Sequence, residues 1–328
     1  MDISQSERKK SYESMSSSSP QSIHDMMSSL KIGEELVEPA QPHEALVLIL
    51  SYLNLFELLR MNQVCKSLRD AIDSDILLWL DIVVEPPLNL RINDDNLLKF
   101  TSKAQGRLRS LVLPSCVRIT DDGLLRVIQN NPHINKLYIP SCSQLTPDGV
   151  VRAVKILAKH NNKLFLRLEN IYNITKEHLQ IIYSCLKLNP EEQNRQKSKL
   201  YLGYGHFQVQ NDLDPIDIEV CPKCKDVRLV FECPRESCRS KNKRPLAACK
   251  GCLLCIPRCE GCGGCVDLDD EIGETVCLDL VCLECWLQLR KCNLCNKPYC
   301  NRHVDKIEWS RPDSYGFVCE VCSTETES

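Results

Sequence analysis

Apolar and polar positions repeat with a period of 26 residues in the middle of the chain. The stretch from Leu108 reads LRSLVLPSCVRITDDGL, and the stretch from Ile134 reads INKLYIPSCSQLTPDGV. A fixed period of this size predicts stacked repeats, because no single unit can bury its apolar face alone. We expect each unit to pair a short strand, at Leu111 and Leu113 in the first copy, with a helix. Thr120, which precedes two aspartates, suits the N-cap of that helix.

Degenerate copies flank these two repeats. Residues 164–179 carry leucines at matching positions, and residues 92–97 resemble the start of a repeat helix. The pattern Leu-x-x-Leu-x-Leu with a cysteine five residues after its second leucine is typical of leucine-rich repeats. About four such units would form a short α/β arc. Cys116 and Cys142 recur at one repeat position, where a small, soft thiol packs into the core.

A mainly apolar segment follows Pro42, a residue that suits the first turn of a helix. Apolar clusters at residues 45–53, 55–61 and 64–72 predict three short helices. The longest uninterrupted apolar run is Ala45 to Leu50. It is far shorter than the ~20 residues that a membrane-spanning helix needs, so we expect no membrane partner.

Residues 41–84 resemble an F-box. The matching motifs are Gln-Pro-His-Glu at 41–44, Ile-Leu-Ser-Tyr-Leu at 49–53, Val-Cys-Lys-Ser-Leu-Arg at 64–69 and Leu-Trp at 78–79. Gln41 and Leu68 depart from the family pattern, in which Leu and Trp are usual. With the cysteine-containing repeats and a cysteine-rich C-terminal domain, the chain resembles plant F-box proteins of the Skp-interacting-partner group.

This resemblance implies a non-catalytic substrate-receptor subunit of a Skp–cullin–F-box ubiquitin ligase. Such a subunit docks on a Skp-type adaptor and, through it, on a cullin. The repeat arc and/or the cysteine-rich domain would hold a protein substrate that the sequence does not identify. The residues implied to face the adaptor or hold its helices are Pro42, Leu46, Ile49, Leu50, Leu53, Val64 and Cys65.

The cysteines mark a separate C-terminal domain. Of 22 cysteines, eighteen lie between Cys221 and Cys322. The N-terminus shows no apolar core of a secretory signal, so free or metal-bound thiols are favoured over disulfides. Pairs spaced Cys-x-x-Cys predict tetrahedral zinc sites, about four structural ions in all. The candidate ligands are Cys221, Cys224, Cys233, Cys238, Cys249, Cys252, Cys259, Cys262, Cys282, Cys285, Cys292, Cys295, Cys300, His303, Cys319 and Cys322.

The order of these pairs suggests a cross-braced arrangement, in which the first pair joins the third and the second joins the fourth. In the C-terminal half this joins Cys282/Cys285 to Cys300/His303 and Cys292/Cys295 to Cys319/Cys322. Upstream it would join Cys221/Cys224 to Cys249/Cys252 and Cys233/Cys238 to Cys259/Cys262. Cys255, Cys265 and Cys277 would be spare, although the triplets of cysteines allow other choices.

The expected organisation is a multidomain α+β chain. A disordered, serine-rich tail spans residues 1–38, since eleven of the first 29 residues are serine. A short helical F-box spans 39–84, an α/β leucine-rich-repeat arc spans 85–215, and a zinc-stabilised cysteine-rich domain spans 216–328. The boundary near 211–215 is where the cysteine content changes.

The charge limits the classes of partner. The chain has 41 Lys and Arg against 44 Asp and Glu, a formal net charge of −3, which disfavours nucleic-acid binding. An alternative function is a RING-like zinc module that recruits a ubiquitin-conjugating enzyme directly. A zinc hydrolase would need an open coordination position and a general base, so we expect no catalytic residues. The nucleus and/or the cytoplasm is the expected location.

Overall fold

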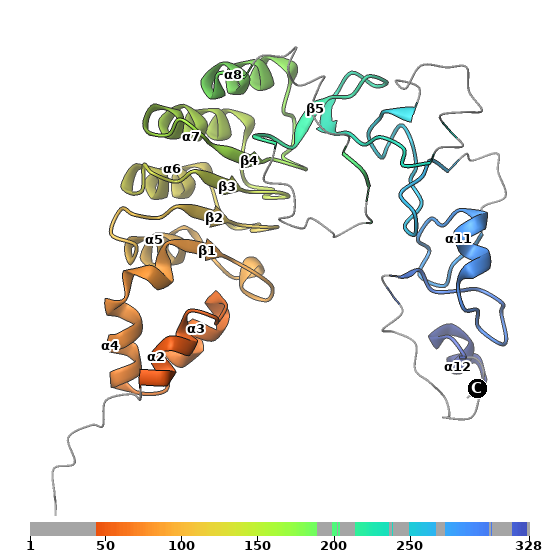
Figure 1. The fold of residues 1–328 in the computed structure, drawn as a ribbon, viewed down its shortest axis with the longest axis horizontal. Helices are drawn as coiled ribbons and strands as arrows, with labels where there is room; N and C mark the ends of the chain where they lie inside the picture. The colour runs from red at the N-terminus through yellow and green to blue at the C-terminus, as the bar shows by residue number, and fades with distance from the viewer. Residues whose placement is uncertain are drawn as a thin grey trace, which may run out of the picture. The chain divides into compact units, whose positions relative to one another are not determined.

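The computed structural model describes residues 44–188, 199–201, 203, 214–235, 238, 249–266, 273–301, 303 and 317–326. The whole serine-rich segment, Pro42 and the residues 211–213 of the expected boundary lie outside the described residues. The described part is a mixed helix and strand structure that begins with an F-box region and continues along the chain to a cysteine-rich region (Figure 1).

The first described elements are three short helices, as the apolar clusters predict. They are α2 (Glu44–Leu50), α3 (Leu55–Met61) and α4 (Lys66–Ser74), followed by the 3-10 turn η1 (Ile76–Trp79). Asn54 begins α3 with a reciprocal cap: its side chain accepts the Glu57 N–H at 2.9 Å, and Glu57 accepts the Asn54 N–H at 2.9 Å. Trp79 is fully buried and donates its indole N–H to the carbonyl of Ile72 at 2.9 Å. The indole therefore fixes η1 to α4.

Four parallel strands form one sheet in chain order. They are β1 (Asp81–Val83), β2 (Ser110–Val112), β3 (Lys136–Tyr138) and β4 (Phe165–Arg167). Ser110 pairs with Lys136, so the β2–β3 register has the same 26-residue period as the sequence. The strand β1 lies before residue 84, in the segment that the sequence assigns to the F-box.

A helix follows each strand. These helices are α5 (Asp94–Ser102), α6 (Asp121–Asn130), α7 (Pro147–His160) and α8 (Lys176–Leu186), which lie beside one another along the sheet (Figure 1); the short turn η2 (Leu88–Leu90) precedes α5. The predicted Thr120 cap is confirmed, since its hydroxyl accepts the Gly123 N–H at 3.3 Å. Thr146 and Thr175 cap the next two helices in the same way.

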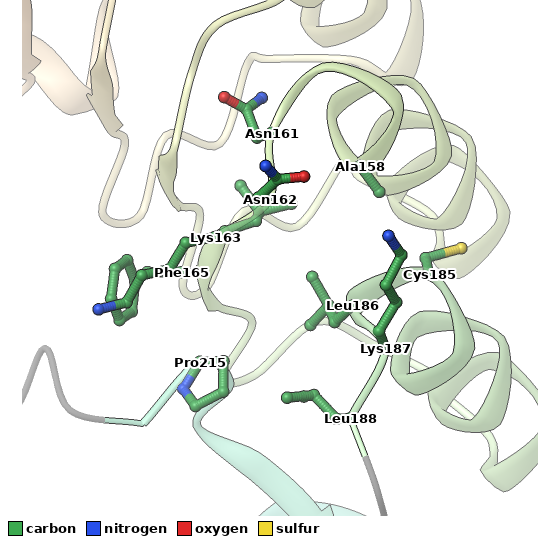
Figure 2. Close-up of a pocket in the computed structure, with 11 residues that line it drawn as sticks. Ala158, Asn161, Asn162, Lys163, Phe165, Cys185, Leu186, Lys187, Leu188 and Pro215 are labelled. Atoms are coloured by element: carbon green, nitrogen blue, oxygen red, sulfur yellow. The ribbon is translucent and has the colours of Figure 1, made fainter.

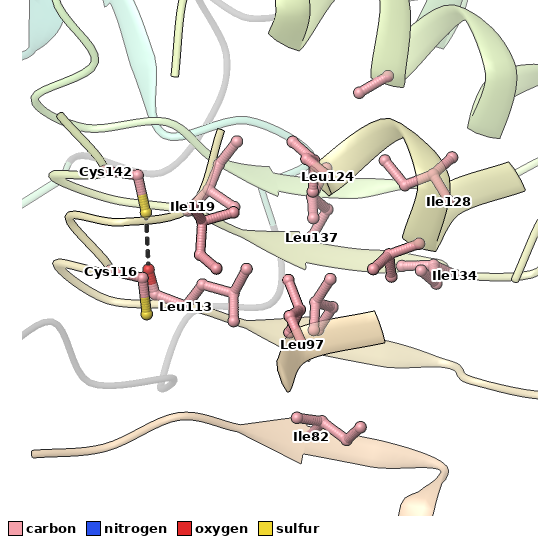
Figure 3. Packing of buried hydrophobic residues seen from close by; sticks show 14 of the residues in the cluster. Ile82, Leu97, Leu113, Cys116, Ile119, Leu124, Ile128, Ile134, Leu137 and Cys142 are labelled. Carbon is pink, nitrogen blue, oxygen red and sulfur yellow. Dashed lines mark hydrogen bonds between the residues drawn. The ribbon is translucent and has the colours of Figure 1, made fainter. Parts of the chain in front are cut away.

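The core of the repeats lies between the strands and the helices (Figure 3). Leu111, Leu137 and Leu166, which occupy equivalent positions in three strands, are fully buried. Cys142 is also fully buried and donates its S–H to the carbonyl of Leu113 at 3.0 Å (Figure 3). It therefore acts as a packed core thiol, as its repeat position predicts.

The open edge of β4 is closed by the chain beyond residue 213. Ile216 forms a parallel bridge with Leu166. The buried carboxylate of Asp217 accepts the N–H groups of Leu168 at 2.8 Å and Glu169 at 3.1 Å. Lys199 donates to the Asp217 carbonyl at 2.8 Å. The edge strand thus has its backbone donors satisfied without a further repeat.

The C-terminal part contains little regular structure. A two-stranded antiparallel sheet, β5 (Ile218–Val220) and β6 (Val227–Leu229), leads into it. The helices described there are α11 (Leu283–Gln288) and α12 (Glu320–Thr326). Its buried clusters are small, and most of their members are cysteines. Among the helices that the structure describes, we find none with the length and apolar content to cross a bilayer.

Candidate metal centres and adaptor surface

The C-terminal cysteines converge into compact groups of potential metal ligands. In each group the ligand atoms all lie within 4.8 Å of one another. The groups are Cys221/Cys224/Cys252/Cys255, Cys259/Cys262/Cys282/Cys285, Cys292/Cys295/Cys319/Cys322, Cys277/Asp279/Cys300/His303 and Cys233/Cys238/Cys265. We call them groups A, B, C, D and E in that order.

Groups A, B and C have the dimensions of a tetrahedral zinc site. Zinc–sulfur bonds of about 2.3 Å place four thiolates about 3.8 Å apart around one ion. The sulfur–sulfur distance is 3.9 Å for Cys224–Cys252, 3.9 Å for Cys262–Cys282 and 3.7 Å for Cys295–Cys319. The thiols therefore stand where zinc would hold them.

A backbone hydrogen bond recurs in these three groups. The first thiol accepts the N–H of the third cysteine, at 3.5 Å in group A, 3.3 Å in group B and 3.3 Å in group C. Burial disfavours the thiolate of Cys221, but N–H donors from Cys224 and Cys252 outweigh it and lower the pKa to about 6. Burial and N–H donors act in the same way on Cys292, whose pKa is also about 6. Both thiols are thus prepared to ligate a metal as thiolates.

Group E has three thiols, and Cys249 is a neighbour of this group. Burial, followed by interactions with the Cys233 and Cys249 thiols, raises the pKa of Cys238 to about 11, so Cys249 lies beside this group. Arg258 donates to the Cys265 sulfur at 3.3 Å and to the Cys249 carbonyl at 2.7 Å. This guanidinium holds the two cysteines next to each other.

Arg235 supplies positive charge to group B. Its guanidinium donates to the sulfur atoms of Cys262, at 3.3 Å, and Cys282. Burial opposes the charge of Arg235, yet the Cys262 thiol and its neighbours raise the guanidinium pKa above its usual range. Four thiolates around a divalent ion leave an excess of two negative charges. The positive charge of Arg235 therefore stabilises the deprotonated thiolates that would bind the metal.

The structure tests the predicted pairing of the cysteines. The grouping of Cys292/Cys295 with Cys319/Cys322 is as expected. The other three pairings are wrong in whole or in part. Cys282/Cys285 joins Cys259/Cys262 instead of Cys300/His303, which joins Cys277/Asp279. Cys221/Cys224 joins Cys252 as predicted, but with Cys255 in the place expected for Cys249. Cys233/Cys238 joins Cys265 instead of Cys259/Cys262. Cys255, Cys265 and Cys277, which were expected to be spare, all belong to a group. The pairing could not be predicted because the spacings between the cysteine pairs are short and nearly equal.

The F-box region exposes an apolar stripe. Ala45, Leu48 and Ile49 of α2 and Tyr52 in the turn after it have the spacing i, i+3, i+4, i+7, and all four are exposed, Leu48 by 71% and Tyr52 by 87%. Leu48, Tyr52 and Leu77, which is also exposed, were not among the predicted adaptor residues. In an apolar run only the three-dimensional fold separates the packed face from the open one.

The predicted adaptor residues divide between surface and core. Ile49, Val64 and Cys65 are exposed. Leu50 is 1% exposed, while Leu46 is half-buried and Leu53 is half-buried against the same core. Leu50 and Leu53 therefore hold the helices together, and Pro42 lies outside the described residues.

Two hollows lie outside these centres. Figure 2 shows a pocket of about 240 Å³ at the ends of α7 and α8, lined by Asn161, Lys163, Cys185, Leu186 and six other described residues, together with Pro215. A second, polar cleft of about 1090 Å³ lies between the loop before α8, including Tyr172, and the turn at Cys224–Arg228. The second cleft is shared by the repeats and the cysteine-rich region.

Comparison with known proteins defines the class. Residues 42–85 match the F-box-like family, and residues 217–294 match the At3g27290 F-box protein C-terminal domain. The second match covers all the ligands of groups A, B and E and part of those of groups C and D. The chain therefore joins an F-box to a dedicated cysteine-rich domain.

Three relatives from Arabidopsis thaliana align with three quarters or more of this chain. F-box protein SKIP28 is 42% identical over 301 residues, which cover 88% of this chain and 92% of that protein. F-box protein SKIP14 is 38% identical over 253 residues, 76% of this chain and 55% of that protein. F-box protein At3g27290 is 34% identical over 256 residues, 75% and 65% respectively. The chain belongs to the F-box proteins.

Proposed function

We propose that this chain is the non-catalytic substrate-receptor subunit of a Skp–cullin–F-box ubiquitin ligase. It docks on a Skp-type adaptor through its F-box, and the adaptor connects it to a cullin. The observation that carries this proposal is the exposed apolar stripe of α2. Leu50, which follows Ile49 in α2, is buried in the same core as α3. The stripe is therefore an exposed surface on a folded helix rather than part of an unfolded segment.

The exposed side chains fit a protein partner. Leu48, Ile49 and Val64 are 71%, 51% and 66% exposed, and Leu48 and Ile49 are consecutive in the chain. Burying such residues contributes about 1.5–3 kcal/mol each. The names of two relatives describe them as SKIP proteins, and the F-box match covers this surface.

Co-purification with a Skp-type adaptor tests the docking surface. The double variant Leu48→Asp/Ile49→Asp places two charges on the exposed stripe and should abolish co-purification while the chain still folds. Leu90→Asp is the matched control, because Leu90 is 58% exposed on η2, outside the helices α2 to α4. Leu50→Asp is unsuitable, since it would put a charge into the core. Equal co-purification of the double variant and the control would disprove the docking surface.

We assign substrate binding to the repeats and the cysteine-rich region together. The strand register and the buried leucines support the interpretation of the strand–helix units as a leucine-rich-repeat arc. The polar cleft beside Tyr172 is bordered by both regions, and Tyr172 is 72% exposed. A photo-crosslinking residue at position 172 should capture a protein substrate, whereas one at Leu90 should not.

The proposal includes a structural zinc ion in each of groups A, B, C and E. The thiol spacings and the N–H donors support closed four-cysteine sites with no position for a reactive water. The expected domain limits, F-box at 39–84, repeats at 85–215 and zinc domain at 216–328, are part of the same proposal.

Direct recruitment of a ubiquitin-conjugating enzyme is the second candidate function. Groups C and D favour it, because their ligands alternate along the chain in the cross-braced order: Cys277/Asp279, Cys292/Cys295, Cys300/His303 and Cys319/Cys322. Ubiquitin transfer by this chain with a conjugating enzyme, in the absence of a cullin, would support this function. Transfer that requires adaptor and cullin would support the receptor function.

A further inference from the structure

Group D differs from the other groups in its ligand chemistry. The Cys300 sulfur lies 3.0 Å from a carboxylate oxygen of Asp279 and 3.3 Å from Nδ1 of His303. Nδ1 of His303 lies 2.9 Å from the same Asp279 oxygen. Two thiols, an imidazole and a carboxylate thus converge from the Cys277–Asp279 turn and the Cys300–His303 turn.

Group D nevertheless shares the backbone pattern of the cysteine-only groups. The N–H of Cys300 donates to the Cys277 sulfur at 3.4 Å, the same relation that links the third cysteine to the first in groups A, B and C. Cys277 also packs against the apolar clusters that contain Cys292 and Cys282. A side chain in contact with two other groups is well placed to be a ligand that ties them together.

The order along the chain places group D between groups B and C. Its first pair, Cys277/Asp279, lies between the two halves of group B, and its second pair, Cys300/His303, lies between the two halves of group C. Group E is related to groups A and B in the same way. Cys249 lies between the two halves of group A, before Cys252, and Cys265 lies between the two halves of group B, after Cys262. Among the described groups, group D therefore has ligands both inside the loop of group B and inside the loop of group C.

We propose that group D is a fifth metal site, a zinc centre with Cys277, Asp279, Cys300 and His303 as ligands. Two thiolates, one imidazole and one carboxylate form an accepted zinc set, with bond lengths of about 2.3 Å to sulfur and about 2.0–2.2 Å to nitrogen and oxygen. These bonds would space the ligand atoms about 3.5 Å apart, so the observed distances need to widen by only a few tenths of an ångström. The inference rests on metal binding by the cysteine-rich region, which is part of the proposed function.

The mixed ligand set makes this ion the first to exchange. Zinc is a borderline-soft ion, and thiolates compete for it better than a carboxylate does. The side chains of Asp279 and His303 are 19% and 22% exposed, which gives a chelator access to the ion. A moderate chelator should therefore remove one zinc before it removes the others.

Metal analysis of the full chain tests the proposal. Purified under reducing conditions, the wild-type chain should hold five zinc ions, and Cys277→Ser/His303→Ala should hold four. Cys185→Ser is the matched control, because Cys185 lies on α8 and belongs to none of the five groups, and it should hold five. Four ions in the wild-type chain, or an unchanged count in the double variant, would overturn the proposal. A chain without any zinc would also overturn the structural-zinc part of the proposed function.

A conservative variant covers the case in which the double variant fails to fold. Asp279→Cys replaces the carboxylate by a third thiolate, so the zinc count should stay at five. In the cobalt-substituted chain, the sulfur-to-cobalt charge-transfer absorption should rise above the wild-type value. The early release of one ion to the chelator should also disappear. Unchanged absorption and unchanged release would show that Asp279 is not a ligand.

Discussion

The carboxylate of Asp94 accepts two hydrogen bonds from Thr120, the backbone N–H at 3.0 Å and the hydroxyl at 2.6 Å. Asp121 makes the same pair of bonds to Thr146, at 2.9 Å and 2.6 Å. In each case the first-turn acid of one repeat helix binds the N-cap of the next. Each such carboxylate therefore fixes the position of two helices at once.

Gly123→Ala should disrupt this link. A methyl group at Gly123 of α6 would lie 2.1 Å from the carboxyl of Asp94 of α5. Neither helix can move away easily, because both pack in the stacked repeats. Alanine normally stabilises a helix interior by about 1 kcal/mol relative to glycine. Here we expect a loss of about 1–3 kcal/mol from overpacking, measured by thermal unfolding. Asp122→Ala, at the neighbouring exposed position, is the control and should change stability little.

Glu169→Gln should change the pH dependence of stability. Burial, and then the charge of Asp217, raises the pKa of Glu169 from 4.5 to about 8. The pKa of Glu169 is higher in the folded chain than in the unfolded chain. The contribution of the protonated Glu169 to the free energy of unfolding is therefore fully present below about pH 4.5 and is lost as the pH rises towards 8. The glutamine variant cannot ionise, so it should gain stability over the parent between pH 5 and pH 8, on the order of a few kcal/mol.

Thermal unfolding at pH 5 and pH 8 measures this gain. Glu85→Gln, at an exposed glutamate before η2, is the control and should follow the parent at both pH values. A Glu169→Gln variant with the same pH profile as the parent would show that Glu169 ionises normally in the folded chain.

Arg235→Ala should weaken metal binding in group B. The substitution removes the guanidinium that donates hydrogen bonds to the Cys262 and Cys282 sulfurs. Loss of a hydrogen bond to a metal ligand typically lowers metal affinity by roughly 10–100-fold. Competition with a chromophoric zinc chelator should show one ion released about 10-fold more readily. Arg126→Ala, at an exposed position of α6, should release zinc as the parent does. If Arg235→Ala released zinc as slowly as the parent chain does, Arg235 would not stabilise the ion in group B.

Removal of zinc should unfold the C-terminal part and leave the repeats folded. The clusters around Cys221, Cys259 and Cys292 have few large apolar members, so the folding free energy there must come from metal ligation. The repeat core is continuous and aliphatic. Hydrogen exchange after chelation under reducing conditions should rise in residues 221–322 and stay slow in β2, β3, α6 and α7. Slow exchange throughout would mean that the thiols are not structural ligands.

Local signals in the sequence predicted much of the fold. The period of 26 residues predicted the strand β2 and the helix α6, and Thr120 predicted where that helix starts. The closure of the β4 edge by Asp217 was not predictable, because it joins residues 49 positions apart with no repeated pattern.

The candidate site was predictable by residue type but not by pairing. Pairs spaced Cys-x-x-Cys identified most of the clustered thiols, whereas only the fold decided which pairs meet. Asp279 was missed because a single aspartate among many gives no ligand signal; its place two residues after Cys277 is the one hint. Likewise, the apolar run 45–50 did not reveal that Leu50 is buried and Leu48 is open.

Calorimetric titration of a purified Skp-type adaptor into this chain measures docking through the F-box. The wild-type chain and the Leu90→Asp control should bind one adaptor per chain with equal affinity. The Leu48→Asp/Ile49→Asp variant, with unchanged thermal unfolding, should lose at least about 100-fold in affinity, since two central apolar contacts are replaced by buried charge. Absence of binding by the wild-type chain, or equal binding by the double variant, would contradict the account.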